Sequence, residues 1–249
     1  MNQKNIPLGV LGGLGPMSTI YFCELLIART KAERDADHID MLISSRASTP
    51  DRTAFILGKS QEDPLPVMIE EANRLASAGA SLLVIPCNTA HYFYDGLKEA
   101  CALPILNIIE ETVAFLHRDG VKTIGLLATD GTVQSRSYEK ICDKYGMTCL
   151  SPDPDGQRII MSIIYDEIKQ NKPVDRAAFM RVANSLLDQG CERLVLGCTE
   201  LSLLGKDVHL DPRIFIDSLE VLAWRTILSC GKEPVGFSDS FDLSRERKA

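Results

Sequence analysis

Two short segments of this chain follow one pattern, and their cysteines lie 111 positions apart. Residues 82–91 read LLVIPCNTAH, an apolar run that ends in proline and leads directly into Cys87. Residues 194–201 read LVLGCTEL, a second apolar run that passes through glycine into Cys198. A short apolar run bounded by Pro or Gly is typical of a buried strand. Two matched strands that each end in a thiol predict two matched halves of one site.

Other parts of the chain repeat at a similar spacing. A strand with a Gly-rich turn is predicted near residue 9 and again near 124, and a final strand near 104 and again near 213. The offsets of 115 and 109 residues are too long for a solenoid repeat and indicate an internal duplication of domain-sized units. Strands that alternate with amphipathic helices predict parallel sheets.

The expected fold is therefore α/β, with two pseudo-symmetric doubly wound lobes and an active-site cleft between them. Lobe 1 is expected to comprise residues 1–112 and to be joined by a closing helix and tail at 218–249; lobe 2 comprises 113–217. Strands are expected at 6–11, 39–45, 81–85, 104–108, 123–128, 148–151, 193–196 and 213–216. Helices are expected at 18–34, 63–78, 88–100, 135–145, 158–170, 175–188 and 219–229.

Composition narrows the class of protein. With 249 residues, 45% of them hydrophobic, the chain can bury a sizeable core. The net charge of −7 and the scattered Lys and Arg argue against nucleic acid or an anionic membrane as a partner. The absence of a secretory signal and of a long apolar run predicts a cytoplasmic protein. The eight cysteines form no CxxC or CxxH pair, which predicts reduced thiols and no structural metal site.

Two loops at predicted strand ends are candidates for ligand binding. The turn at 12–16, GGLGP, lacks the GxGxxG spacing of dinucleotide sites, so its glycines are expected instead to let backbone approach a small ligand. The second loop carries Arg46 and Arg52 on the side where open parallel sheets bind ligands, and an arginine there suits a carboxylate. The alternatives are a solvated arginine or a local ion pair between Asp51 and Arg52.

The two thiols suit inversion of a stereocentre. If the lobes are related by a pseudo-two-fold axis, Cys87 and Cys198 approach a ligand from opposite sides, where one thiolate removes a proton and the other thiol returns one. A helix that starts just beyond each cysteine is expected to lower its pKa. Asn88, Thr89 and Thr199 supply neutral hydrogen-bonding groups for a substrate carboxylate.

His91 and Glu200 are expected to lie behind the two cysteines and to adjust the pKa values of their thiols. The alternative for His91 is a satisfied surface histidine. The alternative for Glu200 is a first-turn carboxylate that the helix dipole favours.

Five segments together resemble aspartate racemases of the cofactor-independent aspartate/glutamate racemase superfamily. They are LGGLGP at 11–16, PDRTAFILGK at 50–59, IPCNTAH at 85–91, GLLAT at 125–129 and GCTEL at 197–201. The resemblance implies two α/β lobes, a dimer, and catalysis without pyridoxal phosphate or metal. It also implies that Cys87 and Cys198 are the acid/base pair, with the first cysteine serving the D-substrate.

The resemblance further assigns substrate contacts. Arg52 and Lys169, the latter matched through the run IIYDEIK, would hold the distal carboxylate. The α-carboxylate and amine would be contacted by Asn88, Thr89, Thr129 and Thr199. The chain departs from the family pattern at 44–50, SSRASTP, where Arg46 adds a cation that affects recognition of the distal carboxylate. Aspartate and glutamate are therefore both kept as candidate substrates.

The leading hypothesis is a racemase that interconverts L- and D-aspartate with two thiol bases, no cofactor and no metal. Alternatives are a glutamate or broader acidic amino-acid racemase, or a related activity such as hydantoin racemase, maleate isomerase or malonate decarboxylase. A sensor that binds an acidic ligand without turnover is a further alternative. The expected partners are a small acidic amino acid and a second copy of the chain.

Overall fold

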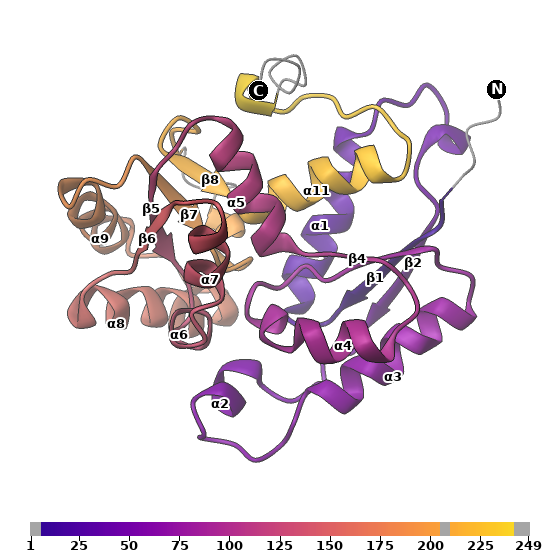
Figure 1. Cartoon of the computed structure of the whole chain (residues 1–249), viewed down its shortest axis with the longest axis horizontal. Coiled ribbons are helices and arrows are strands. Elements are labelled where there is room, and N and C mark those ends of the chain that lie inside the picture. Colours follow the sequence, from indigo (N-terminus) through magenta and orange to yellow (C-terminus); the bar gives the residue numbers. More distant parts are fainter. Residues whose placement is uncertain (1–5, 205–209, 242–249) are drawn as a thin grey trace.

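The computed structural model describes residues 6–204 and 210–241 and shows two four-stranded parallel sheets (Figure 1). The first sheet has the order β2-β1-β3-β4 and the second has the equivalent order β6-β5-β7-β8. The strands of the first sheet are β1 (Leu8–Gly12), β2 (Met41–Ser45), β3 (Leu82–Val84) and β4 (Ile105–Leu106). Those of the second are β5 (Thr123–Leu127), β6 (Thr148–Leu150), β7 (Arg193–Leu196) and β8 (Phe215–Asp217). The predicted pair of α/β lobes is confirmed.

The register of the strands explains why the two cysteines occupy equivalent places. In each sheet the first strand of the lobe is central and pairs with the strand that leads to the cysteine, Val10 with Val84 and Leu127 with Leu196. All five residues of β1 are buried, as expected for a parallel strand covered on both faces. Cys87 and Cys198 therefore follow the carboxyl ends of equivalent strands, where open α/β sheets bind ligands.

Helices connect the strands in both lobes. The first half contains α1 (Pro16–Arg29), α2 (Arg52–Ile56), α3 (Leu65–Ser77), α4 (Tyr94–Ala100) and α5 (Ile108–Arg118). The second contains α6 (Asp130–Gln134), α7 (Ser137–Lys144), α8 (Pro154–Ser162), α9 (Arg176–Asp188) and α11 (Ser218–Ser229). Single 3₁₀ turns lie at 35–37, 89–93, 168–170, 201–203 and 239–241, and a π-helical turn lies at 163–167.

Several helices differ from the sequence expectation. The helix expected to reach residue 34 ends at Arg29, where Thr30 turns to extended backbone and bridges to Pro234. The helix expected at 135–145 begins at Ser137, because Arg136 before it adopts a left-handed conformation with φ of 54°, and it is preceded by the short helix α6. The helix α5 was not expected, although Asn107 caps it by accepting from two backbone N–H groups.

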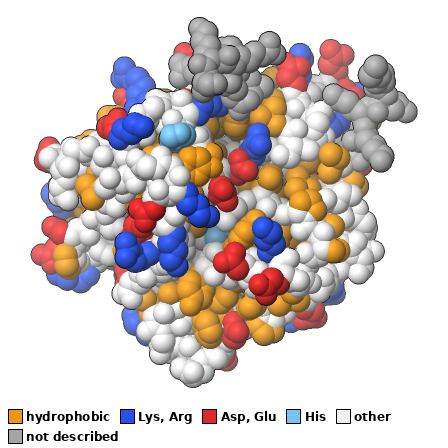
Figure 2. Space-filling model, in the orientation of Figure 1, with side chains coloured by type: hydrophobic (Ala, Val, Ile, Leu, Met, Phe, Trp, Pro, Cys, Tyr) orange, Lys and Arg blue, Asp and Glu red, His pale blue; other side chains and the backbone are white. Residues whose placement is uncertain are grey.

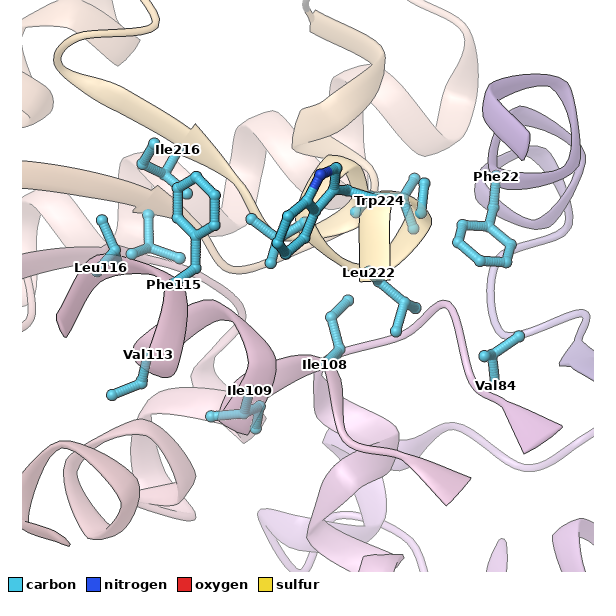
Figure 3. Close-up of a cluster of buried hydrophobic side chains, with 14 of the residues drawn as sticks. Phe22, Val84, Ile108, Ile109, Val113, Phe115, Leu116, Ile216, Leu222 and Trp224 are labelled. Carbon is cyan, nitrogen blue, oxygen red and sulfur yellow. The ribbon is translucent and has the colours of Figure 1, made fainter. Parts of the chain in front are cut away.

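One hydrophobic cluster is shared by the two lobes (Figure 3). It contains Val84 from the first sheet and Ile216 from the second, together with side chains of α1, α5 and α11. The closing helix α11 packs against both α1 and α5, and its Trp224 meets Phe115 edge-on at 6.0 Å. The lobe boundary at residue 112 stays a prediction, and α5 runs continuously across it. The shared core holds the two sheets in a fixed relation.

The surface carries mixed charge. On the face shown in Figure 2, Lys and Arg side chains are interspersed with Asp and Glu. No helix in the described part of the chain is long and apolar enough to cross a membrane. Within residues 6–204 and 210–241, no three His, Cys, Asp or Glu side chains gather as the ligands of a metal ion would.

Candidate active site

A cavity lies between the two lobes at the carboxyl ends of β3 and β7. It is lined by nine of the ten residues that the sequence assigned to the site: Arg52, Cys87, Asn88, Thr89, Thr129, Lys169, Cys198, Thr199 and Glu200. Four lining residues were not predicted as site residues: Leu14, Asp51, Thr53 and Tyr165. Since both lobes contribute, the cavity exists only when the two halves are assembled.

The two thiols are buried in unequal electrostatic environments. Burial raises the pKa of Cys87, whereas the positive charges of Arg52 and Lys169 oppose that rise. Burial and the nearby carboxylate of Glu200 together raise the pKa of Cys198 well above its ordinary value. The Cys198 thiol donates a hydrogen bond of 2.9 Å to Glu200 Oε2. Cys87 is thus the thiol that ionises more readily, and Cys198 is the one that keeps its proton.

The expectation that helix N-termini lower both cysteine pKa values is wrong. Cys87 and Cys198 are followed by 3₁₀ turns, Thr89–Phe93 and Leu201–Leu203, rather than directly by α-helices. Such short turns align few peptide dipoles. Desolvation is the largest influence on both thiols, and it disfavours the thiolate.

His91 lies behind the cavity and contacts the main chain of Cys87, not its thiol. Its Nδ1 lies 2.8 Å from the Cys87 carbonyl, and its Nε2 accepts a hydrogen bond of 3.3 Å from the backbone N–H of Ile108. Because Nε2 accepts, Nδ1 must carry the proton and donate to the carbonyl. Burial lowers the pKa of His91 to about 4, so the ring is neutral. His91 is a satisfied histidine, as the alternative held, but a buried one.

Glu200 connects Cys198 with the cationic side of the cavity. Lys169 Nζ lies 3.9 Å from Glu200 Oε1 and 3.9 Å from the centre of the Tyr165 ring. Burial is the largest influence and lowers the pKa of Lys169, but Glu200 and other nearby acidic groups together outweigh it, so the net shift is upward. Tyr165 was missed in the sequence, although its position four residues before Lys169 would place both on one face of a helix.

Arg52 keeps a free donor and an uncompensated charge. Its two terminal nitrogens donate to the backbone carbonyls of Thr49, Pro50 and Leu14, at 2.9–3.3 Å. Its buried Nε has no hydrogen-bond partner, and none of the described carboxylates forms an ion pair with it. Asp51 accepts from Ala54 N–H at the start of α2, so the local Asp51–Arg52 pair is not formed.

Hydroxyl groups from both lobes meet at the cavity wall. Thr89 Oγ1 lies 2.9 Å from Oγ1 of Thr129 and 2.9 Å from that of Thr132, a residue that was not predicted. The buried Oγ1 of Thr199 has no partner among the described residues. An unsatisfied buried hydroxyl in a cavity is a ready hydrogen-bonding group for a ligand.

One other expectation needs correction. Arg46 does not line the cavity and pairs with Glu70 at 2.7 Å and Glu71 at 2.8 Å, so it adds no cation to the site. Gly13 and Gly15 of the first turn line the recess outside the cavity, and both also approach other parts of the chain. A Cβ at Gly13 would lie 2.5 Å from backbone atoms of Arg46, and one at Gly15 would lie 2.5 Å from Glu200 Oε1.

The cavity continues outward into a larger recess of about 1050 Å³ that is open to solvent. The two spaces share four lining residues: Asp51, Arg52, Lys169 and Glu200. The passage between them is therefore lined by two cations and two carboxylates, and an acidic ligand would pair with the cations Arg52 and Lys169. The inner cavity places two buried thiols around a site with a free guanidinium donor, which suits proton transfer at carbon in a small acid.

The sequence matches a known protein family. Residues 11–226 match the family model described as Asp/Glu/Hydantoin racemase. The chain is 27% identical over 227 residues to a broad-specificity amino-acid racemase of Bacillus subtilis, which covers 88% of this chain and 96% of that protein. A glutamate racemase of Shewanella loihica is 28% identical over 157 residues, an alignment that covers 59% of this chain and 56% of that protein.

A solved structure extends the comparison to the fold. The aspartate racemase of Picrophilus torridus superposes with a TM-score of 0.81 at 29% identity, covering 96% of this chain and 100% of that one. The family match spans both sheets and both cysteines. This chain belongs to the Asp/Glu/hydantoin racemase family.

Proposed function

We propose that the protein racemises aspartate by a two-base mechanism that uses Cys87 and Cys198 and needs no cofactor. The observation that carries the proposal is the cavity itself, which two buried thiols line from equivalent strand ends of the two lobes. A deprotonating base and a protonating acid on opposite faces of a carbon are what inversion requires. A sensor for acidic ligands would not need this pair.

Charged groups on one side of the cavity orient the substrate. Arg52 offers its free Nε to the distal carboxylate, and Lys169 adds a second positive charge. The hydroxyl of Thr199 and the amide of Asn88 are available to the α-carboxylate. Donors to that carboxylate stabilise the negative charge that develops on it when the α-proton leaves. Thr89 and Thr129 complete this wall.

The unequal thiols set the order of ionisation. Cys87, next to the cations, gives up its proton more readily than Cys198, and its thiolate removes the α-proton of one enantiomer. Cys198 then gives its proton to the opposite face, and its new thiolate faces Lys169. For the other enantiomer the roles reverse, with Cys198 as the base and Cys87 as the acid. Following the family resemblance, the first direction starts from D-aspartate.

Glutamate is the second candidate substrate, and the outer recess is the observation that favours it. The recess begins at Arg52 and Lys169, so a side chain longer by one methylene has space beyond the inner cavity. The similarity to both an aspartate racemase and glutamate racemases supports acidic amino acids as the substrate class.

The test is racemisation in deuterium oxide without added cofactor. Each enantiomer of aspartate and glutamate is incubated with the pure protein, and chirality and α-deuterium are followed together. Interconversion with deuterium in the product is expected, faster for aspartate. Cys87→Ser and Cys198→Ser should each abolish interconversion. Exchange without inversion in the wild-type protein would show that only one thiol acts, and absence of exchange with all four acids would refute the proposal.

A homodimer is a further part of the proposal. Met17, Ile20 and Ile27 lie on one exposed face of α1, at 60%, 56% and 50% exposure. Such an apolar stripe is a feature of surfaces that a partner covers. Light scattering should give twice the mass of the chain, and a monomer at all concentrations would refute this part. The cytoplasmic location stays a prediction.

A further inference from the structure

A hydrogen-bond chain that crosses between the lobes holds the side chain of Asn88. Tyr138 OH in α7 donates to Asn88 Oδ1 at 2.8 Å, and Asn88 Nδ2 donates to Ser218 Oγ at 3.0 Å. Ser218 Oγ in turn donates to the carbonyl of Leu196 at 2.7 Å. Tyr138 and Ser218 are fully buried and Asn88 is 2% exposed. The three hydrogen bonds therefore run in one direction along the chain.

The chain also joins the two halves of the proposed catalytic pair. Asn88 directly follows Cys87, and Leu196 ends the strand β7 two residues before Cys198. Tyr138 and Ser218 belong to the second half of the sequence. A single series of bonds thus ties the backbone beside one thiol to the backbone beside the other.

We infer that Tyr138 and Ser218 are positioning residues that fix which end of the Asn88 amide faces the substrate, an inference that rests on the proposed racemase function. With Oδ1 engaged by Tyr138 and one Nδ2 hydrogen engaged by Ser218, the second Nδ2 hydrogen is left for the cavity that Asn88 lines. A substrate carboxylate there meets a donor.

The reversed amide would be unfavourable for two reasons. Nδ2 would face the phenol oxygen, so Tyr138 OH would lose Asn88 as its acceptor and would have to turn to the hydroxyl of Thr112 or Ser218. Oδ1 would face Ser218, whose hydrogen already goes to Leu196. An acceptor rather than a donor could then point at the α-carboxylate, whose growing negative charge it would oppose. The hydroxyls of Tyr138 and Ser218 therefore act on the reaction through Asn88, without touching the substrate.

The perturbation is Tyr138→Phe, which keeps the ring and removes only the hydroxyl. Removing a transition-state donor outright costs roughly 100- to 1000-fold in kcat, so a donor that is free to flip should cost about 10- to 100-fold. KM should change little in comparison, because the interaction strengthens as charge develops. Ser218→Ala should act in the same direction, and Ser218→Thr, which restores the hydroxyl, should recover part of the loss.

The decisive readout is a double-variant cycle with Asn88→Ala. If Tyr138 acts through Asn88, adding Tyr138→Phe to Asn88→Ala causes almost no further loss of kcat. Tyr145→Phe, the same change just beyond the end of α7, is the control and should keep wild-type kinetics. Thermal unfolding verifies that each variant is folded. If Tyr138→Phe does not fold, the same double-variant cycle is measured with Ser218→Ala in its place.

The outcomes separate the two proposals. A kcat loss that disappears in the Asn88→Ala background supports the inference. Additive losses, or a kcat unchanged by both Tyr138→Phe and Ser218→Ala, overturn it while leaving the racemase proposal intact. A wild-type protein that racemises none of the acids overturns both.

Discussion

The contact between Gly15 and Glu200 gives the sharpest test of how Cys198 is controlled. Gly15 has φ of −115° and ψ of 133°, which any residue can adopt, so Gly15→Ala introduces no backbone strain. Its new Cβ would lie 2.5 Å from Glu200 Oε1, however, where ordinary contacts begin at 3.4 Å. The variant therefore acts on the carboxylate without replacing any residue that lines the inner cavity.

The size of the effect follows from this overlap. The carboxylate must retreat by about 0.9 Å, which lengthens and weakens the 2.9 Å hydrogen bond from Cys198. A hydrogen bond to a charged group contributes about 1.5–3 kcal/mol. At about 1.4 kcal/mol per tenfold, loss of the whole bond sets an upper limit of roughly 10- to 150-fold on the fall in kcat/KM, and the weakened bond costs a part of that. The factor must be the same for both enantiomers, because they have equal free energies.

The pH dependence of kcat/KM shows in which direction the pKa of Cys198 moves. Glu200 raises the pKa of Cys198, so a withdrawn carboxylate lowers that pKa. Since Cys198 must keep its proton in the resting enzyme, the alkaline limb of kcat/KM should move to lower pH. Polarimetry of aspartate racemisation across neutral and alkaline pH measures both effects.

The control is Glu200→Ala, which removes the group that the new methyl group contacts. Adding Gly15→Ala to Glu200→Ala should cause no further loss. An equal loss in both backgrounds, or full activity of Gly15→Ala with an unmoved alkaline limb, would refute the reasoning.

Two predictions concern stability. His91 is neutral in the fold, with a pKa of about 4 against about 6.5 when unfolded, so the unfolded state binds its proton first on acidification. The unfolding free energy should fall by about 3 kcal/mol as the pH drops from about 6.5 to about 4, and urea titrations of His91→Gln should lack this slope. Leu222→Ala in the shared core should cost about 2–5 kcal/mol and still leave one transition. Fluorescence of Trp224, the single tryptophan, should then coincide with circular dichroism; two separate transitions would contradict a shared core.

The residues of the site were largely accessible from the sequence because local patterns mark them. Cys87 and Cys198 follow short apolar runs, and parallel strands place such residues at one edge of a sheet. The loop after the second strand marked Arg52 as a candidate, and the resemblance to a known family added Thr129 and Lys169, which carry no local signal. All five line the cavity.

What the sequence could not predict depends on neighbours far apart in the chain. Arg46 and Arg52 look equivalent in the loop, yet one pairs with α3 and the other keeps a free donor at the cavity. The sequence allowed two interpretations of His91, a residue that adjusts the thiols or a satisfied histidine, and only its contacts with Cys87 and Ile108 distinguish them. Side-chain partners of this kind are set by long-range packing, which periodicity does not encode.

Strand and turn patterns are local, so they were enough to predict the two α/β halves and a thiol at the end of each matching strand. Long-range packing decides that the thiols are unequal, that Glu200 accepts from Cys198, and that Tyr138 and Ser218 hold the side chain of Asn88. These properties arise where the two halves meet, because burial and charge there depend on side chains separated by more than 100 residues, such as Asn88 and Ser218.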